Sequence, residues 1–287
     1  MEIKSTAFSG SWYPGSAKEC EKSVQGFLQF GSDPGNNIGG IVPHAGWVYS
    51  GAIACRVIAS LVSQSSIPDT IILFGAHMHP SSPAFLLDSG AVDTPLGIIE
   101  ADGELATIVV NALAKQGQVI RALSPGAFPD ENTLELQFAF IRYFFPNARI
   151  LVCGVPPSDQ AVRIGEAVVE GANALGRKIR IIGSTDMTHY GPNFGFEPAG
   201  EGEAALDWVR QENDARAVRA LEEMDVSGII AQGLTNHNMC CSGAAAAAVA
   251  ACKKMGVVKG ICLDYATSYE ISRSSSFVGY CGMVYPV

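Results

Sequence analysis

The sequence predicts an α/β protein with a mostly parallel sheet and helices on both faces. Short apolar runs rich in Val and Ile alternate with longer segments of helical periodicity along the chain. The apolar runs have the character of strands that are buried on both faces. Hydrophobic residues make up 48% of the 287 residues and charged residues 16%, which is typical of a folded protein with a large core.

The order of the expected elements follows from these patterns. We expect strands over residues 38–43, 70–75, 84–88 with a further stretch to 100, 148–155, 178–184, 257–264 and 277–285. We expect helices over residues 49–63, 103–116, 131–145, 159–175, 202–224 and 240–255. The helix over 202–224 is the most charged and is expected to be the most exposed. No linker or shift in composition divides the chain, so we expect a single domain over residues 1–287, with an inserted hairpin around 88–96.

Composition also limits the classes of partner and location. The net charge of -9 argues against nucleic acid or an anionic membrane as the main partner. The sequence contains no apolar run of 18 residues, so we expect no transmembrane helix. The N-terminal stretch lacks the apolar core of a signal peptide. A cytoplasmic location is therefore expected. The chain has eight cysteines and no Cys-x-x-Cys motif. We expect reduced, buried cysteines that act as small hydrophobic residues at Cys55, Cys153, Cys252, Cys262 and Cys281.

All five histidines lie in short motifs, and three of these motifs follow expected strands. They contain His44, then His77 and His79, then Asp186 with His189. In open α/β sheets, ligands bind beyond the carboxyl ends of the strands. We therefore expect these side chains to meet at one sheet edge, as a metal site or an acid/base site requires.

Two of these motifs carry further chemistry. Asp186 stands three residues before His189, so its carboxylate can orient the imidazole as a general acid/base pair requires, although it could instead cap a helix. His77 and His79 are two residues apart, and the residues do not decide whether one or both face the site.

Cys240 and Cys241 open an expected helix shortly after His237. The positive end of the helix dipole favours a thiolate there, and with it metal ligation or nucleophilic attack. The sequence does not choose between the two thiols.

Two groups of residues are candidates for the rim of a site. Glu131, Asn132 and Glu135 head an amphipathic helix and are either solvated or part of the rim. Trp12 and Tyr49 lie in or beside loops and either line a pocket or pack the chain termini down.

Taken together, these motifs resemble the Memo family, called AmmeMemoRadiSam system protein B in prokaryotes. The matching segments are residues 9–14, 43–51, 74–79, 131–138, 184–191 and 237–243, with Ser268 and residues 278–280 near the C-terminus. The resemblance implies a fold similar to class III extradiol dioxygenases, which hold non-haem Fe(II) with two His and one carboxylate. Memo relatives place a Cys where the carboxylate would be.

What the resemblance implies about the site is specific. The metal ligands would be His44, His79 and Cys241, and Asp186 with His189 would be the catalytic acid/base pair. Trp12 and Tyr49 would line the mouth of the pocket, and His77, Glu131, Asn132 and His237 are our further candidates for its lining. The metal would be copper or iron, with zinc possible, and three protein ligands would leave a position open. Redox activity on an unknown small molecule or peptide is expected, together with a functional link to a radical SAM protein.

Three other functions are compatible with the same residues. One is a true extradiol-type ring-cleaving dioxygenase, although dioxygen can oxidise a thiolate ligand. Another is a non-catalytic protein whose pocket binds a peptide or partner. The third is a hydrolase that uses Cys241 and His189 without any metal.

Overall fold

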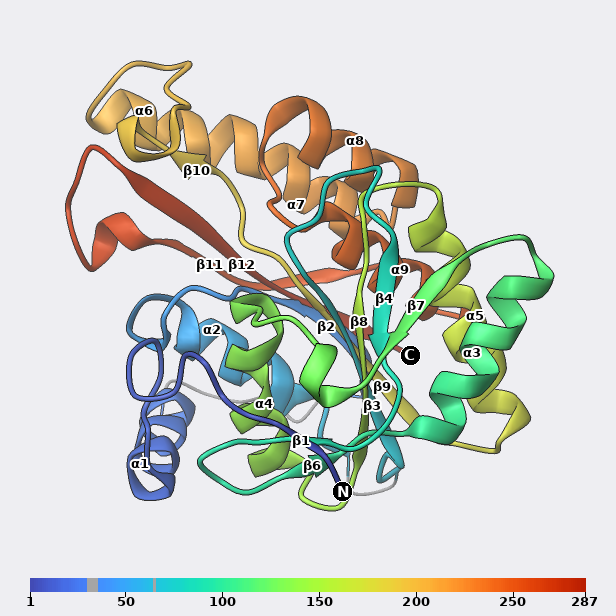
Figure 1. Ribbon diagram of the computed structural model, residues 1–287. Coiled ribbons are helices and arrows are strands. Elements are labelled where there is room, and N and C mark those ends of the chain that lie inside the picture. The colour runs from blue at the N-terminus through green and yellow to red at the C-terminus, as the bar shows by residue number, and fades with distance from the viewer. Residues whose placement is uncertain (30–35, 64–65) are drawn as a thin grey trace.

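The computed structural model describes residues 1–29, 36–63 and 66–287, and its centre is one mixed β-sheet (Figure 1). The strands of this sheet are β2 (Asn37–Val42), β3 (Thr70–Gly75), β4 (Ala84–Leu87), β7 (Ile120–Leu123), β8 (Arg149–Gly154), β9 (Ile179–Ser184), β10 (His189–Tyr190), β11 (Ile261–Thr267) and β12 (Phe277–Pro286). They lie in the order β10-β12-β2-β9-β3-β8-β4-β7, and β11 pairs with β12 beside this path.

The middle of the sheet is parallel and its sides are antiparallel. Strands β2, β9, β3 and β8 run parallel to one another. On one side β12 is antiparallel to β2, and on the other β4 is antiparallel to β8. The α/β class is therefore confirmed, with a second parallel pair, β4 with β7, beyond the antiparallel contact of β4 with β8. Strands β11 and β12 are antiparallel because a short connection joins them, whereas parallel strands need a longer crossover.

Helices cover both faces of the sheet (Figure 1). On one side lie α1 (Ala17–Leu28), α2 (Trp47–Ser60) and α4 (Asn132–Phe144). On the other lie α3 (Gly103–Lys115), α5 (Gln160–Ala174), α7 (Asp214–Glu222), α8 (Val226–Asn236) and α9 (Ser242–Lys254). Alternate residues of β3 divide between the two cores: Ile71 and Leu73 face the first group, and Ile72 and Phe74 face the second.

Helix α9 lies very close to the sheet because its side chains are small. All of its alanines are buried, and a Cβ added at Gly183 of β9 would lie 2.7 Å from the Cβ of Ala248. A larger side chain at either position would push the helix away from the sheet. This close contact fixes the start of α9 against the end of β9.

Several elements differ from the expectation. The helix expected over 202–224 consists of α6 (Glu203–Trp208), a π-helical turn (Val209–Asn213) and α7, and it buries Asn213 and Asp214 rather than being fully exposed. The sequence patterns missed α1, α8 and β7. Strand β11 runs from Ile261 to Thr267, shifted toward the C-terminus from the expected 257–264.

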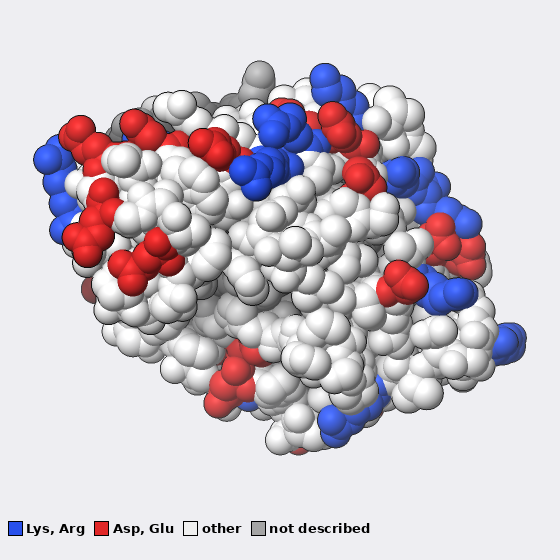
Figure 2. All heavy atoms as spheres, turned by 90° about the horizontal axis from the view of Figure 1, so that it is seen from above, with Lys and Arg blue, Asp and Glu red and all other residues white. Residues whose placement is uncertain are grey.

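A second, small sheet lies at the opposite end from α6. It consists of β1 (Ile3–Lys4), β5 (Ala91–Val92) and β6 (Ile99–Glu100), and β5 and β6 form an antiparallel hairpin near the expected insertion. No helix among the described residues is long and apolar enough to cross a membrane. Seen from above, the molecule has a hollowed, largely uncharged centre, with acidic and basic side chains gathered toward its margins (Figure 2).

Candidate metal centre

The ends of three neighbouring parallel strands and the start of one helix meet at one edge of the sheet. His44 follows β2 by two residues, Asp186 follows β9 by two, and His77 follows β3 by two. Cys240 lies two residues before α9, which packs on β9. Adjacent parallel strands end on the same side, so residues from distant parts of the chain converge there, as the sequence predicts.

Four side chains form a compact group that could hold a metal ion. One ligand atom each of His44, His77, Cys240 and Cys241 lies within 4.8 Å of the others. The Nε2 atom of His44 is 3.2 Å from the sulfur of Cys240, and the two sulfurs are 3.7 Å apart. The rings of His44 and His77 meet edge to face, with their centroids 5.1 Å apart.

Hydrogen bonds on the side that faces away from Cys240 fix the orientation of His44. Its Nδ1 shares a hydrogen bond with the hydroxyl of Ser184 at 2.9 Å, and its backbone N–H donates to Oδ1 of Asp186 at 2.7 Å. Its backbone carbonyl accepts from the side-chain amide of Asn132 at 3.3 Å. With Nδ1 engaged, Nε2 is the ring atom that faces the sulfur of Cys240, and this is the usual arrangement of a metal-binding histidine.

Cys240 is the sulfur at the centre of the group. The backbone N–H of Asp186 donates to this sulfur at 3.3 Å, and the N–H of Cys240 donates to the carbonyl of Asp186 at 3.2 Å. Burial raises the pKa of Cys240, but the neighbouring Cys241 thiol and the His44 and His189 imidazoles outweigh it and hold the pKa well below its ordinary value. Burial and the Cys240 thiolate raise the pKa of Cys241. Cys240 is therefore the thiolate of the pair.

The backbone turns sharply just before His77. Ala76 has φ 77°, a left-handed conformation that costs free energy for a residue with a Cβ, and its N–H is held by Thr133 Oγ1 at 2.7 Å. The Nδ1 of His77 lies 3.5 Å from Oε2 of Glu131. Burial lowers the pKa of His77, but Cys240 and Glu131 outweigh it and raise the pKa to about 10.

His79, which the resemblance had assigned as a ligand, lies outside this group. It is exposed, and its Nδ1 is 2.7 Å from the hydroxyl of Ser81. The turn at Ala76 directs the first imidazole of the pair into the site, and the chain then leads away from it. His77 therefore occupies the place expected for His79. The one sequence signal that would have favoured His77 over His79 is its position nearer the end of the strand.

Asp186 and His189 lie side by side, as expected for an acid/base pair. Their Oδ2 and Nε2 atoms are 3.9 Å apart, and Nε2 is buried with no hydrogen-bond partner in the described part of the chain. Burial lowers the pKa of His189, but Asp186 and Cys240 outweigh it and raise the pKa to about 10. His189 therefore carries a proton at neutral pH in the metal-free protein.

A buried carboxylate that sequence reasoning missed supports this loop from behind. Asp214 accepts hydrogen bonds from the N–H of Thr188 at 3.0 Å, from the Thr188 hydroxyl at 2.5 Å and from the hydroxyl of Tyr265 at 2.6 Å. Asn213, at the end of the π-helical turn, donates to the Thr188 hydroxyl at 3.0 Å. The irregular turn thus directs two polar side chains at the residue next to His189.

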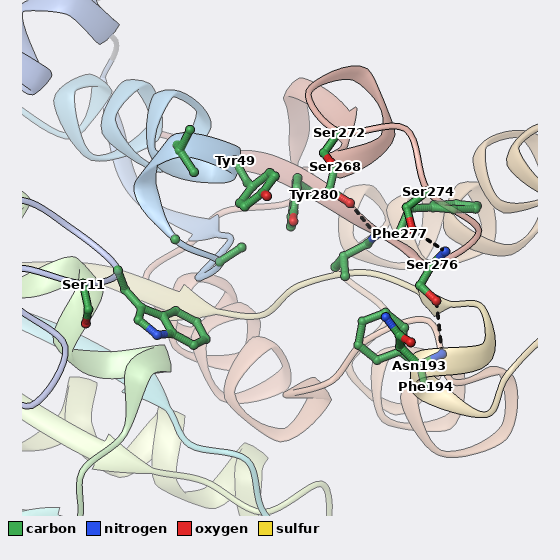
Figure 3. A pocket seen from close by; sticks show the side chains of 15 residues that line it. Ser11, Tyr49, Asn193, Phe194, Ser268, Ser272, Ser274, Ser276, Phe277 and Tyr280 are labelled. Carbon is green, nitrogen blue, oxygen red and sulfur yellow. Dashed lines mark hydrogen bonds between the residues drawn. The ribbon is translucent and has the colours of Figure 1, made fainter.

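Two cavities flank the site. The larger, of about 510 Å³, lies between the N-terminal loop, the start of α2 and the segments around β12 (Figure 3). Trp12 and Tyr49 line it, as the pocket assignment predicts. The other, of about 420 Å³, is lined by His189, His237 and Cys240. Phe194 lines both cavities, and neither has a Lys, Arg, Asp or Glu among its lining residues.

The two glutamates at the head of α4 have different roles. Glu131 faces His77 and belongs to the surroundings of the group. Glu135 is buried and accepts hydrogen bonds from the backbone N–H groups of Ala7 and Phe8, each at 2.8 Å, and from the Tyr13 hydroxyl at 3.1 Å. Glu135 thus anchors the N-terminal loop that carries a wall of the larger cavity.

Fold and site together define an α/β protein with a histidine–cysteine group at the carboxyl ends of its parallel strands, in which His44 and Cys241 are buried and His77 is exposed. A family model described as Memo-like protein matches residues 4–284. The chain is 33% identical to a MEMO1 family protein of Pyrococcus abyssi, over 98% of this chain and 99% of that protein. It is 31% identical to MEMO1 family proteins of Thermococcus onnurineus, over 99% of each chain, and of Methanopyrus kandleri, over 98% of each. The chain belongs to the Memo family.

Proposed function

We propose that this protein binds one copper or iron ion through His44, His77 and Cys240 and carries out redox chemistry on a small, uncharged substrate. The observation that carries the proposal is the group of two imidazoles and two sulfurs within 4.8 Å of one another, formed from segments far apart in the sequence. Zinc fits the same donor atoms and would leave only non-redox chemistry.

The donor atoms suit a soft or borderline transition metal. Imidazole and thiolate ligands favour copper, zinc and iron, whereas magnesium and calcium prefer oxygen. The lowered pKa of Cys240 supports its role as the thiolate ligand, in place of Cys241. Ser184 and Glu131 lie behind His44 and His77 and would fix the two rings. When bound, the metal would supply an electrophilic, redox-active centre.

The protein's own groups would handle protons. His189 holds a proton at neutral pH, and its Nε2 has no other partner among the described residues. The residue also lines the smaller cavity, so its ring lies beside the space for a bound molecule, as a general acid requires. Asp186 would keep the ring in place from one side and Thr188, held by Asp214, would fix the backbone on the other.

The lining of the larger cavity favours an uncharged substrate, because it offers no Lys, Arg, Asp or Glu to offset the desolvation of a charged molecule. Three serine hydroxyls of the larger cavity, on Ser268, Ser274 and Ser276, accept hydrogen bonds from backbone N–H groups. Ser268 donates its own O–H to Tyr280, whereas within the described residues the O–H groups of Ser274 and Ser276 are left to donate to a bound molecule. Figure 3 shows these serines around the cavity, near Tyr49, Phe194 and Tyr280. A substrate with a flat apolar part and oxygen acceptors would match them.

The test is the metal content of protein purified without added metal, measured by inductively coupled plasma mass spectrometry. We expect close to one equivalent of copper or iron in the wild type and a loss of most of it in His44→Ala. His237→Asn is the matched control, because His237 lines the cavity but lies outside the group and Asn tolerates its left-handed backbone. Metal content that is unchanged in His44→Ala would refute the proposal.

Oxygen uptake separates redox function from the alternatives. Protein loaded with the metal should consume oxygen in the presence of a reductant, and His44→Ala should not. Uptake that requires a catechol, after anaerobic loading with Fe(II), would instead indicate an extradiol-type dioxygenase. Metal binding without any turnover, together with retained peptide or partner binding, would indicate a non-catalytic binding protein.

A further inference from the structure

A second pair of thiols lies outside the metal centre, in the hairpin of β11 and β12. Cys262 and Cys281 have their sulfurs 3.8 Å apart. Cys262 stands opposite Met283, so Cys281, two residues before Met283, is its diagonal neighbour on the same face of the hairpin. A bulge in β11 lies between Cys262 and Asp264. Closing the pair to a disulfide, with its S–S bond of about 2.05 Å, would bring the sulfurs closer by roughly 1.8 Å.

The two thiols of this pair differ in accessibility and in acidity. Cys262 is partly exposed on β11, which pairs only with β12 within the described residues, whereas Cys281 is fully buried. A hydrogen bond from Cys281 lowers the pKa of Cys262, and the same contact raises the pKa of Cys281. Cys262 is therefore the more accessible and more acidic thiol of the pair, and Cys281 is the protected thiol beside it.

Four of the other cysteines do not share these features, and the two that do, Cys240 and Cys241, have their sulfurs 3.7 Å apart. Cys20, Cys55, Cys153 and Cys252 are buried, and burial raises the pKa of each. Cys240 and Cys241 belong to the metal centre. The expectation that Cys262 is buried is wrong, because the edge position of β11 leaves it partly open to solvent, although it packs against the core.

We propose that Cys262 and Cys281 form a covalent modification site that reacts with hydroperoxides and closes to an intramolecular disulfide. The Cys262 thiolate attacks the hydroperoxide, so an S–O bond forms, the O–O bond breaks and the alkoxide leaves with a proton as an alcohol or water. Cys281 then attacks the sulfur of the resulting sulfenic acid. An S–S bond forms, the S–O bond breaks and water leaves with the Cys281 proton, so two thiols are oxidised as one hydroperoxide is reduced.

This proposal is independent of the metal centre, and peptide mapping tests it on the wild-type protein. Metal-free protein is treated with hydrogen peroxide, its remaining thiols are alkylated in denaturant, and it is digested with trypsin without reduction. Cleavage after Lys259 and Arg273 places Cys262 in peptide 260–273 and Cys281 in peptide 274–287, whereas Cys240, Cys241 and Cys252 share peptide 220–253. We expect a species equal to the first two peptides joined, two hydrogen masses lighter than their sum.

Three variants complete the test. In Cys281→Ser, Cys262 should stop at the sulfenic acid, which dimedone traps. In Cys262→Ser, Cys281 should remain alkylatable at peroxide concentrations that oxidise the wild type. Cys252→Ser, which removes a buried thiol outside the pair, should leave the joined peptide unchanged. The proposal is overturned if Cys262 in the wild type is oxidised while Cys281 stays alkylatable, or if Cys262 joins another cysteine instead.

Discussion

The sulfur of Cys240 lies 3.2 Å from Nε2 of His44, although the two residues are 196 positions apart in the sequence. Asp186 joins them, since its backbone exchanges hydrogen bonds with Cys240 and its carboxylate accepts from the His44 N–H. The short distance is therefore a product of the sheet, in which β2 and β9 are neighbours and α9 begins beside them.

The first prediction separates His77 from His79. His77→Ala removes an imidazole of the group. We expect metal affinity to fall at least about tenfold, because mutating even a residue that only hydrogen-bonds to a metal ligand typically lowers affinity by that much. His79→Ala removes an exposed ring held only by Ser81 and should leave affinity unchanged. Competition with a chelator of known affinity measures both. The reverse order of effects would restore His79 as the ligand.

A second prediction concerns the two sulfurs. In protein loaded with cobalt(II), a thiolate ligand produces a charge-transfer band in the near ultraviolet. We expect Cys240→Ser to abolish this band and Cys241→Ser to retain it, because Cys240 is the thiolate of the pair. Serine keeps the size of the side chain, so each variant serves as the control for the other. Loss of the band in Cys241→Ser alone would contradict the assignment.

Much of the fold follows from the sequence because buried parallel strands leave a strong apolar pattern. Strand β3 has the predicted bounds of 70–75, and β9 begins one residue later than expected. The short strand β7 was missed because two of its four residues, Arg121 and Ala122, are exposed, so no apolar run marks it. The π-helical turn has no signature in the pattern either, since helical periodicity continues on both sides of it.

The site was only partly predictable for a related reason. Strand ends located the loops that carry His44, Asp186 and His189, because topology alone brings such ends together. The choice between His77 and His79 depends on a single backbone dihedral at Ala76, and no residue type in this loop predicts that dihedral. A positive φ at alanine is uncommon, so only the structure could reveal this dihedral.

A third prediction tests the anchor of the N-terminal loop. Glu135→Gln replaces one buried carboxylate oxygen, which accepts a backbone N–H, with an NH2 group that only donates, so the N–H of Ala7 or Phe8 loses its partner. We expect the free energy of unfolding to fall by about 1–3 kcal/mol. Hydrogen exchange of residues 5–14 should become faster. Glu201→Gln, at an exposed position, is the control and should change neither quantity.

The last prediction uses the buried carboxylate behind the His189 loop. Burial, partly offset by the hydrogen bonds from Thr188 and Tyr265, raises the pKa of Asp214 from 3.8 to about 6. Between these values the folded state binds more protons at this group than the unfolded state, so its contribution to stability is complete below about pH 4 and is lost as the pH rises to about 6.

Asp214→Asn should remove this dependence while keeping an acceptor for Thr188 and a donor for the Tyr265 hydroxyl. Urea unfolding at pH 4, 5, 6 and 7 gives the difference in unfolding free energy between wild type and variant. The unfolding free energy of the wild type should fall relative to that of the variant by up to roughly 3 kcal/mol between pH 4 and 6, since each pKa unit is worth about 1.4 kcal/mol. Above pH 6 the difference should stay constant. A difference that is constant across this range would show that Asp214 titrates alike in the folded and unfolded states, and its burial beside His189 would then need another explanation.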